Sequence, residues 1–268
     1  MRTRKRRTTT TAADGGGPAA PSPKRTSEGR PGFVARLGVP WFLALGAFAA
    51  LALAIDADGP LPIDRAILNP IPRLGGVFGA TPVDAASGVL GLVRRGDYLG
   101  ALLAIVSSVG DSPAGALALL VPVLAFLYWA GYRSASIALG LADVTSAVAN
   151  FSLKGAIGRP RPAPNDDWVQ VPQSEFAFPS GHTVHYTVLF GFLALWAWKC
   201  MQPGWKRHAV VAVCLSMLVL VGPSRLYLAA HWPTDVVGGY LLGYVWLGAW
   251  VALIPSVWQR HDTARSSA

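Results

Sequence analysis

Long apolar runs separated by short polar turns dominate this chain from residue 37 onward. A hydrophobic stretch of about 20 residues is long enough to cross a bilayer as an α-helix. Five runs rich in Leu, Ala and Val reach or approach that length: Leu37–Ile55, Pro113–Tyr132, Ser134–Leu153, Ser180–Trp198 and Val236–Ile254. A sixth run, Ala209–Pro223, is shorter but can continue helically past Ser224. The pattern therefore predicts an all-α, polytopic membrane helical bundle with about six transmembrane helices.

The apolar run Tyr98–Val109 is too short for a crossing at about 12 residues. Together with Val83–Arg95 it predicts an interfacial hairpin, although the pattern leaves open whether Tyr98–Val109 crosses the membrane. Residues 1–36 hold almost no bulky apolar side chain and cannot bury enough surface to fold, so they predict a disordered basic tail. The expected organisation is this tail, a membrane domain over 37–258 and a C-terminal tail over 259–268.

Composition supports a membrane protein, because 52% of the residues are hydrophobic and only 14% are charged, whereas soluble domains carry about 25% charged residues. The net charge of +9 raises the question of nucleic acid, but nine of the 23 basic residues lie in the first 36 positions. The others are thinly spread between apolar runs, which speaks against a nucleic-acid-binding face.

The positive-inside rule orients the predicted spans. With both termini in the cytoplasm, 15 of the 23 basic residues lie on the inner side and eight on the outer side. Four of those eight cluster at the predicted mouths of the spans: Lys154, Arg159, Arg161 and Arg225. Charge at a membrane boundary is costly unless it has a use, so the outer face is where the chemistry is expected.

These basic residues have the chemistry of a phosphate site. Arginine binds phosphate oxygens through two parallel hydrogen bonds, and lysine adds a compact charge. Ser180 and Gly181 open a predicted span, and the free N–H groups of a helix N-terminus form an anion cradle. A snorkelling anchor is the alternative role for any single lysine or arginine here. The joint occurrence of the three segments favours phosphate binding.

Two histidines and a carboxylate lie in the same segments. One histidine can attack phosphorus while another protonates the leaving oxygen. His182 follows Gly181, and Asp235 follows His231 by four residues, which suits a carboxylate that fixes an imidazole tautomer. Asp235 could also serve as the N-cap of the last span.

The pattern K-x6-R-P, then P-S-G-H, then S-R-x5-H-x3-D resembles the three-part signature of the type 2 phosphatidic acid phosphatase family, membrane lipid phosphatases related to vanadium haloperoxidases. The resemblance covers about Pro113 to Ile254, with the signature between residues 150 and 240. It implies a helical bundle, no metal or other cofactor, and inhibition by vanadate. It also implies that His231 forms a phosphohistidine, Asp235 orients it and His182 is the general acid. The implied phosphate ligands are Lys154, Arg161, Ser180, Gly181 and Arg225.

Four polar residues outside the signature are candidates for supporting roles. Asp143 and Asn150 share one helical stripe with Lys154, where Asp143 could support the site or make an interhelical hydrogen bond. His185 lies one turn after His182 and could border the site or simply pack. Arg159 could contact a second phosphate or lie on the surface of a proline-rich turn.

The expected function is a lipid phosphate phosphatase of the plasma membrane with its active site at the extracytoplasmic face. Polyprenyl diphosphate, phosphatidic acid and phosphatidylglycerol phosphate are all open as substrates. One alternative is a lipid phosphotransferase that uses the same phosphohistidine, and another is a non-catalytic phospholipid-binding membrane protein. The expected partners are a lipid substrate and the bilayer, with no nucleic acid, and the sequence predicts no oligomeric state.

Overall fold

The computed structural model describes residues 32–55, 59–68, 88–94, 96–108, 110, 112–162, 176–228, 230–254 and 256–260. Every regular element in these ranges is a helix. In chain order they are α1 (Phe33–Ala54), α2 (Pro62–Leu68), α3 (Gly88–Arg94), α4 (Tyr98–Ser108), α5 (Pro113–Trp129), α6 (Arg133–Ile157), α7 (Gly181–Cys200), α8 (Trp205–Tyr227) and α9 (Pro233–Leu253). The predicted disorder over residues 1–31 and the last eight residues of the C-terminal tail lie outside the described residues.

The six predicted spans correspond to the helices α1, α5, α6, α7, α8 and α9. By length and apolarity, four of these can cross a membrane: α1, α6, α8 and α9. The bent pair of α4 and α5 adds a fifth span if the two helices are counted together. The 20-residue α7 is less apolar because its first two turns contain His182 and His185. The chain is therefore a multi-pass membrane protein, and apolarity alone identifies fewer spans than the six expected.

Helix α1 begins at Phe33, so the last four residues of the predicted disordered tail are helical. The guanidinium of Arg36 donates a hydrogen bond to the carbonyl of Ala252, 2.8 Å away, which ties this first turn to the end of α9. The helix is kinked at Gly38, whose φ of 72° is non-helical, two residues before Pro40. The tail prediction was wrong at its boundary because it ignored this tertiary contact.

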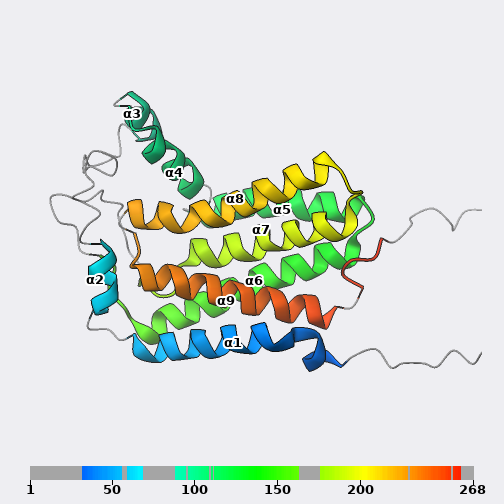
Figure 1. The fold of residues 1–268 in the computed structure, drawn as a ribbon, viewed down its shortest axis with the longest axis horizontal. Coiled ribbons are helices and arrows are strands. Elements are labelled where there is room, and N and C mark those ends of the chain that lie inside the picture. The colour runs from blue at the N-terminus through cyan, green and yellow to red at the C-terminus, as the bar shows by residue number, and fades with distance from the viewer. Residues whose placement is uncertain are drawn as a thin grey trace, which may run out of the picture. The chain divides into compact units, whose positions relative to one another are not determined.

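Helix α7 occupies the middle of the bundle, where it packs against α6, α8 and α9, while α1 covers α9 (Figure 1). Small residues allow the close approach of α7 and α9. A Cβ added to Gly239 would lie 2.7 Å from the carbonyl oxygen of Ser180, and one added to Gly243 would lie 2.6 Å from the Cβ of Thr187. Membrane helices commonly associate through such small residues.

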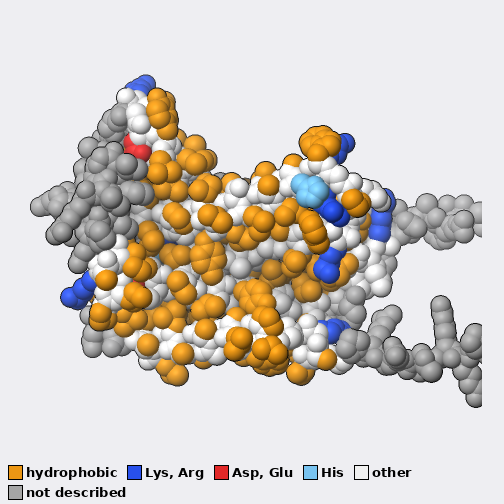
Figure 2. Space-filling model, in the orientation of Figure 1, with side chains coloured by type: hydrophobic (Ala, Val, Ile, Leu, Met, Phe, Trp, Pro, Cys, Tyr) orange, Lys and Arg blue, Asp and Glu red, His pale blue; other side chains and the backbone are white. Residues whose placement is uncertain are grey.

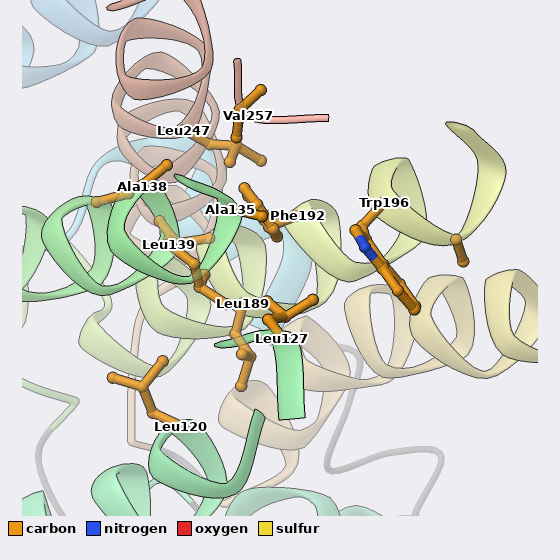
Figure 3. Close-up of a cluster of buried hydrophobic side chains, with 13 residues drawn as sticks. Leu120, Leu127, Ala135, Ala138, Leu139, Leu189, Phe192, Trp196, Leu247 and Val257 are labelled. Carbon is orange, nitrogen blue, oxygen red and sulfur yellow. The ribbon is translucent and has the colours of Figure 1, made fainter. Parts of the chain in front are cut away.

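The largest buried apolar cluster joins α5, α6, α7 and α9, and it includes Leu127, Leu139, Phe192 and Leu247 (Figure 3). Apolar side chains also cover much of the outer surface of the helices (Figure 2). On α5, for example, Leu117, Val121 and Phe126 are all exposed. An apolar exterior of this kind is suited to contact with lipid.

Helices α1 and α9 run antiparallel. In addition to the Arg36 contact with Ala252, the indole N–H of Trp41 donates to the carbonyl of Val245 at 2.8 Å, and Ile55 at the far end of α1 packs in one cluster with Phe178. The start of α1 and the end of α9 therefore lie at one end of the bundle. The end of α6 and the starts of α7 and α9 lie at the other, which is where the signature residues meet.

Candidate active site

Four helix ends form the candidate site: the ends of α6 and α8 and the starts of α7 and α9. Gly158, with a left-handed φ of 67°, ends α6 and turns the chain toward Arg159 and Arg161. The backbone N–H of Ser180 donates to the carbonyl of Asp235 at 3.0 Å, which joins the start of α7 to that of α9. Residues far apart in the sequence are thereby held in one place.

His231 lies in the connection between α8 and α9 and is almost fully buried, with 2% exposure. Its Nε2 lies 3.5 Å from a guanidinium nitrogen of Arg161, and its Nδ1 lies 3.5 Å from Oδ2 of Asp235. A guanidinium can only donate hydrogen bonds, so Nε2 presents its lone pair and the proton belongs on Nδ1, facing the carboxylate. This tautomer leaves Nε2 available as a nucleophile among the cations.

The environment of His231 opposes its protonation. Burial is the largest cause that holds the pKa of His231 well below its usual value, followed by the positive charges of Lys154, Arg161, Arg225 and His182. Each of these groups penalises an additional positive charge on the imidazole. The neutral imidazole, which can attack phosphorus, is therefore the form present in the free protein.

The three predicted phosphate-binding cations are held by hydrogen bonds to other parts of the chain. The ammonium of Lys154 donates to the carbonyl of Phe176 at 2.5 Å. The guanidinium of Arg161 donates to the carbonyl of Ala230 at 3.0 Å, and that of Arg225 donates to the hydroxyl of Ser107. All three act electrostatically on His231. The site thus concentrates positive charge around one neutral nitrogen, as a phosphate dianion requires.

The start of α7 supplies the expected backbone cradle. Ser180 is the N-cap residue, its side chain is fully buried, and its Oγ accepts a hydrogen bond from the Thr183 hydroxyl at 3.0 Å. Helix α7 begins at Gly181, where an added Cβ would lie 3.2 Å from the amide nitrogen of Asn150. Asn150 therefore lies directly beside the start of α7, and within the described part of the chain its buried Oδ1 has no hydrogen-bond partner.

His182 faces Arg225 and the end of α4. Its Nε2 lies 3.3 Å from a guanidinium nitrogen of Arg225 and 3.2 Å from the carbonyl oxygen of Ser107. A Cβ added to Gly110 would lie 2.5 Å from the imidazole, so Gly110 leaves the space that the ring occupies. Sequence reasoning missed Ser107 and Gly110, since a short apolar segment carries no signal of a contact with His182.

Asp235 is not the N-cap of α9, which is Trp232. It occupies the third helical position, where its Oδ2 accepts a hydrogen bond from the N–H of Trp232 at 2.8 Å. Its distance of 3.5 Å from Nδ1 of His231 is longer than a good hydrogen bond, and that nitrogen has no hydrogen-bond partner among the described residues. The Asp235 carboxylate therefore faces the imidazole but does not form a good hydrogen bond with it in this structure.

Arg159 is fully buried, so its interpretation as a surface residue of the turn was wrong. Its guanidinium lies between two carboxylates, 2.5 Å from Oδ2 of Asp64 and 2.5 Å from Oδ1 of Asp235. These bonds use the donors that a second phosphate would need. Asp64, on α2, was not predicted because nothing in its local sequence distinguishes it from a surface residue.

Asp143 and His185 pair with each other deeper in the bundle. Nδ1 of His185 lies 2.7 Å from Oδ1 of Asp143, across the interface of α6 and α7. This contact corresponds to the interhelical interpretation of Asp143.

Among the residues that the structure describes, no group of three or more His, Cys, Asp or Glu side chains could hold a metal ion. The cluster of cations and neutral imidazole described above has the chemistry of an anion site. A phosphoryl group bound there would meet a nucleophilic nitrogen and an array of hydrogen-bond donors at once.

Comparison with known proteins shows a similarity to one family in this region. Residues 132–259 match the model of the PAP2 superfamily. Phosphatidylglycerophosphatase B of Bacillus subtilis is 37% identical over 100 residues, which are 37% of this chain and 48% of the relative. Phosphatidylglycerophosphatase B of Escherichia coli K12 is 33% identical over 84 residues, 30% of each protein. A putative undecaprenyl-diphosphatase of Escherichia coli K12 is 34% identical over 70 residues, 26% of this chain and 30% of the relative.

The chain therefore spans half or less of the length of these curated relatives. A solved structure extends the likeness over more of the chain. The crystal structure of a transmembrane PAP2-type phosphatidylglycerolphosphate phosphatase from Bacillus subtilis is similar with a TM-score of 0.55 and 25% identity. The match covers 77% of this chain and 92% of that protein.

Proposed function

Residues 132–259 of this chain form a PAP2 superfamily domain, and from this premise we propose that the protein is a lipid phosphate phosphatase that works through a phosphohistidine on His231. The proposal rests on the environment of His231. Its buried imidazole is neutral, and its Nε2 faces Arg161. A protein that only bound phospholipid would gain nothing from a nucleophile kept neutral among cations.

In the proposed reaction, Nε2 of His231 attacks phosphorus in line with the leaving oxygen, and the phosphorus–oxygen bond breaks as the nitrogen–phosphorus bond forms. His182 donates a proton to the departing oxygen, and water then hydrolyses the phosphohistidine. Lys154, Arg161 and Arg225 stabilise the negative charge on the equatorial oxygens. The N–H groups at the start of α7 add to this stabilisation.

The proposed substrate is a phosphomonoester or diphosphate of a membrane lipid. A cationic site at the ends of apolar helices lets the lipid tail stay in hydrocarbon while the phosphate enters the site. Relatives named as a phosphatidylglycerophosphatase and a putative undecaprenyl-diphosphatase support this class. Phosphatidylglycerol phosphate, polyprenyl diphosphate and phosphatidic acid are the candidates to compare.

The test is phosphate release by detergent-purified protein from these three lipids in the presence of chelator. We expect release from at least one lipid and its loss in His231→Ala. The matched control is His208→Ala, which removes an exposed histidine on α8 that packs on Trp198. Full activity of His231→Ala would contradict the assigned nucleophile. Phosphate transfer that depends on an added acceptor would favour a phosphotransferase, and failure to cleave any of the lipids would favour a binding protein.

A further inference from the structure

A buried network of three charged side chains adjoins the candidate site at Asp235. Arg159, Asp64 and Asp235 each have 0% exposure. One guanidinium nitrogen of Arg159 lies 2.5 Å from Asp64 and the other lies 2.5 Å from Asp235. One cation is thus shared by two carboxylates from different helices, α2 and α9.

Every carboxylate oxygen in the network has a partner. Oδ1 of Asp64 accepts a hydrogen bond from the N–H of Thr234 at 2.9 Å. Its Oδ2 accepts from the Thr234 hydroxyl at 2.9 Å and from the N–H of Leu61 at 3.0 Å. The Arg159 guanidinium also donates to the hydroxyl of Thr234 at 2.8 Å. All four carboxylate oxygens are therefore hydrogen-bonded, which favours one defined orientation of the two carboxylates.

Stability alone is a poor reason for such an arrangement. Removing a carboxylate and a guanidinium from water costs several kcal/mol per ion, and well-packed apolar side chains often serve a fold equally well. The network instead fixes the orientation of the Asp235 carboxylate. Oδ1 of this carboxylate is held by Arg159 and Oδ2 by the N–H of Trp232, so the group cannot rotate. Its Oδ2 is thereby kept toward Nδ1 of His231.

We propose that Asp64 and Arg159 are positioning residues that act through Asp235 to orient His231 during phosphoryl transfer. This inference rests on the proposed phosphatase function. The present distance of 3.5 Å between Asp235 and His231 shortens when the imidazole gains positive charge, because a charge-assisted hydrogen bond then forms. A carboxylate already held in place needs no reorientation at that moment.

Asp64 lies outside residues 132–259, the region that matches the family model. Arg159 also donates from its Nε to the carbonyl of Gly59, 3.3 Å away, just before α2. The segment 59–68 is thus joined to the candidate site by two residues of the site region, Arg159 and Thr234. A segment that precedes residues 132–259 therefore helps to hold the carboxylate of Asp235, the proposed orienting residue, in place.

The test compares Asp64→Asn and Arg159→Lys with the unaltered protein on the lipid that it cleaves fastest. In Arg159→Lys the positive charge is kept, but one ammonium cannot bind both carboxylates in the same geometry. We expect each variant to lower kcat about tenfold or more, with KM changed less than about twofold, because the phosphate ligands are intact. Rates are expressed per bound vanadate, so that a smaller folded fraction does not imitate a slower step.

The deciding measurement is a double-mutant cycle with Asp235→Asn. If Asp64 acts through Asp235, Asp64→Asn causes no further loss in the Asp235→Asn background, whereas losses that multiply would overturn the proposal. Normal kcat in both Asp64→Asn and Arg159→Lys would also overturn it. The control Ser136→Ala removes a partly buried hydrogen bond from α6 to the Leu124 carbonyl of α5 and should leave kcat unchanged. Absence of turnover by the unaltered protein, with vanadate still bound, would count against the proposed function instead.

Discussion

At the scale of single residues, the site combines a buried imidazole with several cations that lie close enough to act on it. The same cations would bind the substrate phosphate and keep His231 neutral before the substrate arrives. In the proposed mechanism, the same charges would therefore serve both phosphate binding and activation of the nucleophile. This dual use would let a histidine act as a nucleophile in so positive a site.

The dependence of activity on pH follows from this arrangement. Protonated His231 cannot attack, and its lowered pKa means that the neutral form persists below pH 6.5. We expect the acid limb of kcat/KM to lie below pH 6.5. Arg161→Gln removes one cation, raises the pKa of His231 and should move this acid limb to higher pH, even though the variant is slower.

The pH profile of kcat/KM, measured on one lipid for both proteins, checks this expectation. Arg207→Gln is the control, since Arg207 stacks on Trp198 at 4.5 Å, near the start of α8 and away from the site. An acid limb at or above pH 6.5 in the unaltered protein would contradict the account. An acid limb that lies at the same pH in Arg161→Gln as in the unaltered protein would also contradict the account.

The sequence motifs predicted which residues of the three segments meet, because each motif residue sits at a helix end whose position follows from the apolar runs. The support of Asp235 was not predictable in the same way. In the sequence, Arg159 looks like one more basic residue of a turn. Its two carboxylate partners, Asp64 and Asp235, lie 95 and 76 positions away along the chain. A buried ion pair between such distant segments leaves no local pattern.

At the scale of helices, the geometry of the site depends on how closely α7 and α9 approach. Gly239 faces the carbonyl of Ser180, the residue that caps the phosphate cradle. Any side chain at position 239 must move one helix start relative to the other. The proposed nucleophile His231 and the start of α7 belong to opposite sides of this contact, so their spacing would change.

Gly239→Ala should therefore lower both stability and activity. The new Cβ would lie 2.7 Å from the Ser180 carbonyl oxygen, and such overpacking costs about 1–3 kcal/mol. Thermal unfolding in detergent and phosphate release measure the two effects. The control is Gly46→Ala on α1, where nothing lies within 4 Å of the added Cβ. Equal stability and activity of the two variants would show that this helix contact is not critical.

The apolar pattern predicted the bounds of the long helices well, because a run of spanning length has few other stable forms in a membrane. It was less informative for the short elements. Helix α2 is only seven residues long, yet it carries Asp64, and the end of α4 contacts His182 through Ser107. Such contacts depend on tertiary packing that periodicity does not encode.

At the scale of the whole chain, the candidate site lies at one end of the described helical bundle. The start of α1 lies at the opposite end. The excess of basic residues at the end away from the site puts that end in the cytoplasm under the positive-inside rule. We therefore propose that both termini are cytoplasmic and that the site faces the outside of the plasma membrane.

Single-cysteine labelling tests this orientation. Arg94 and Arg133 are both exposed, at the end of α3 and at the start of α6 respectively. In a background with Cys200 and Cys214 replaced by alanine, a membrane-impermeant maleimide should label Arg94→Cys in intact cells. Arg133→Cys should react only after the cells are permeabilised. The reverse pattern would place the site in the cytoplasm.

The central claim is that His231 carries the phosphoryl group during turnover, and trapping that intermediate tests it most directly. The best lipid substrate, labelled in its terminal phosphate, would be mixed with the protein and the reaction quenched in base within one turnover. The account predicts an acid-labile, base-stable label on the peptide that contains His231, absent from His231→Ala. Turnover without a trapped label, or a label on another residue, would contradict it.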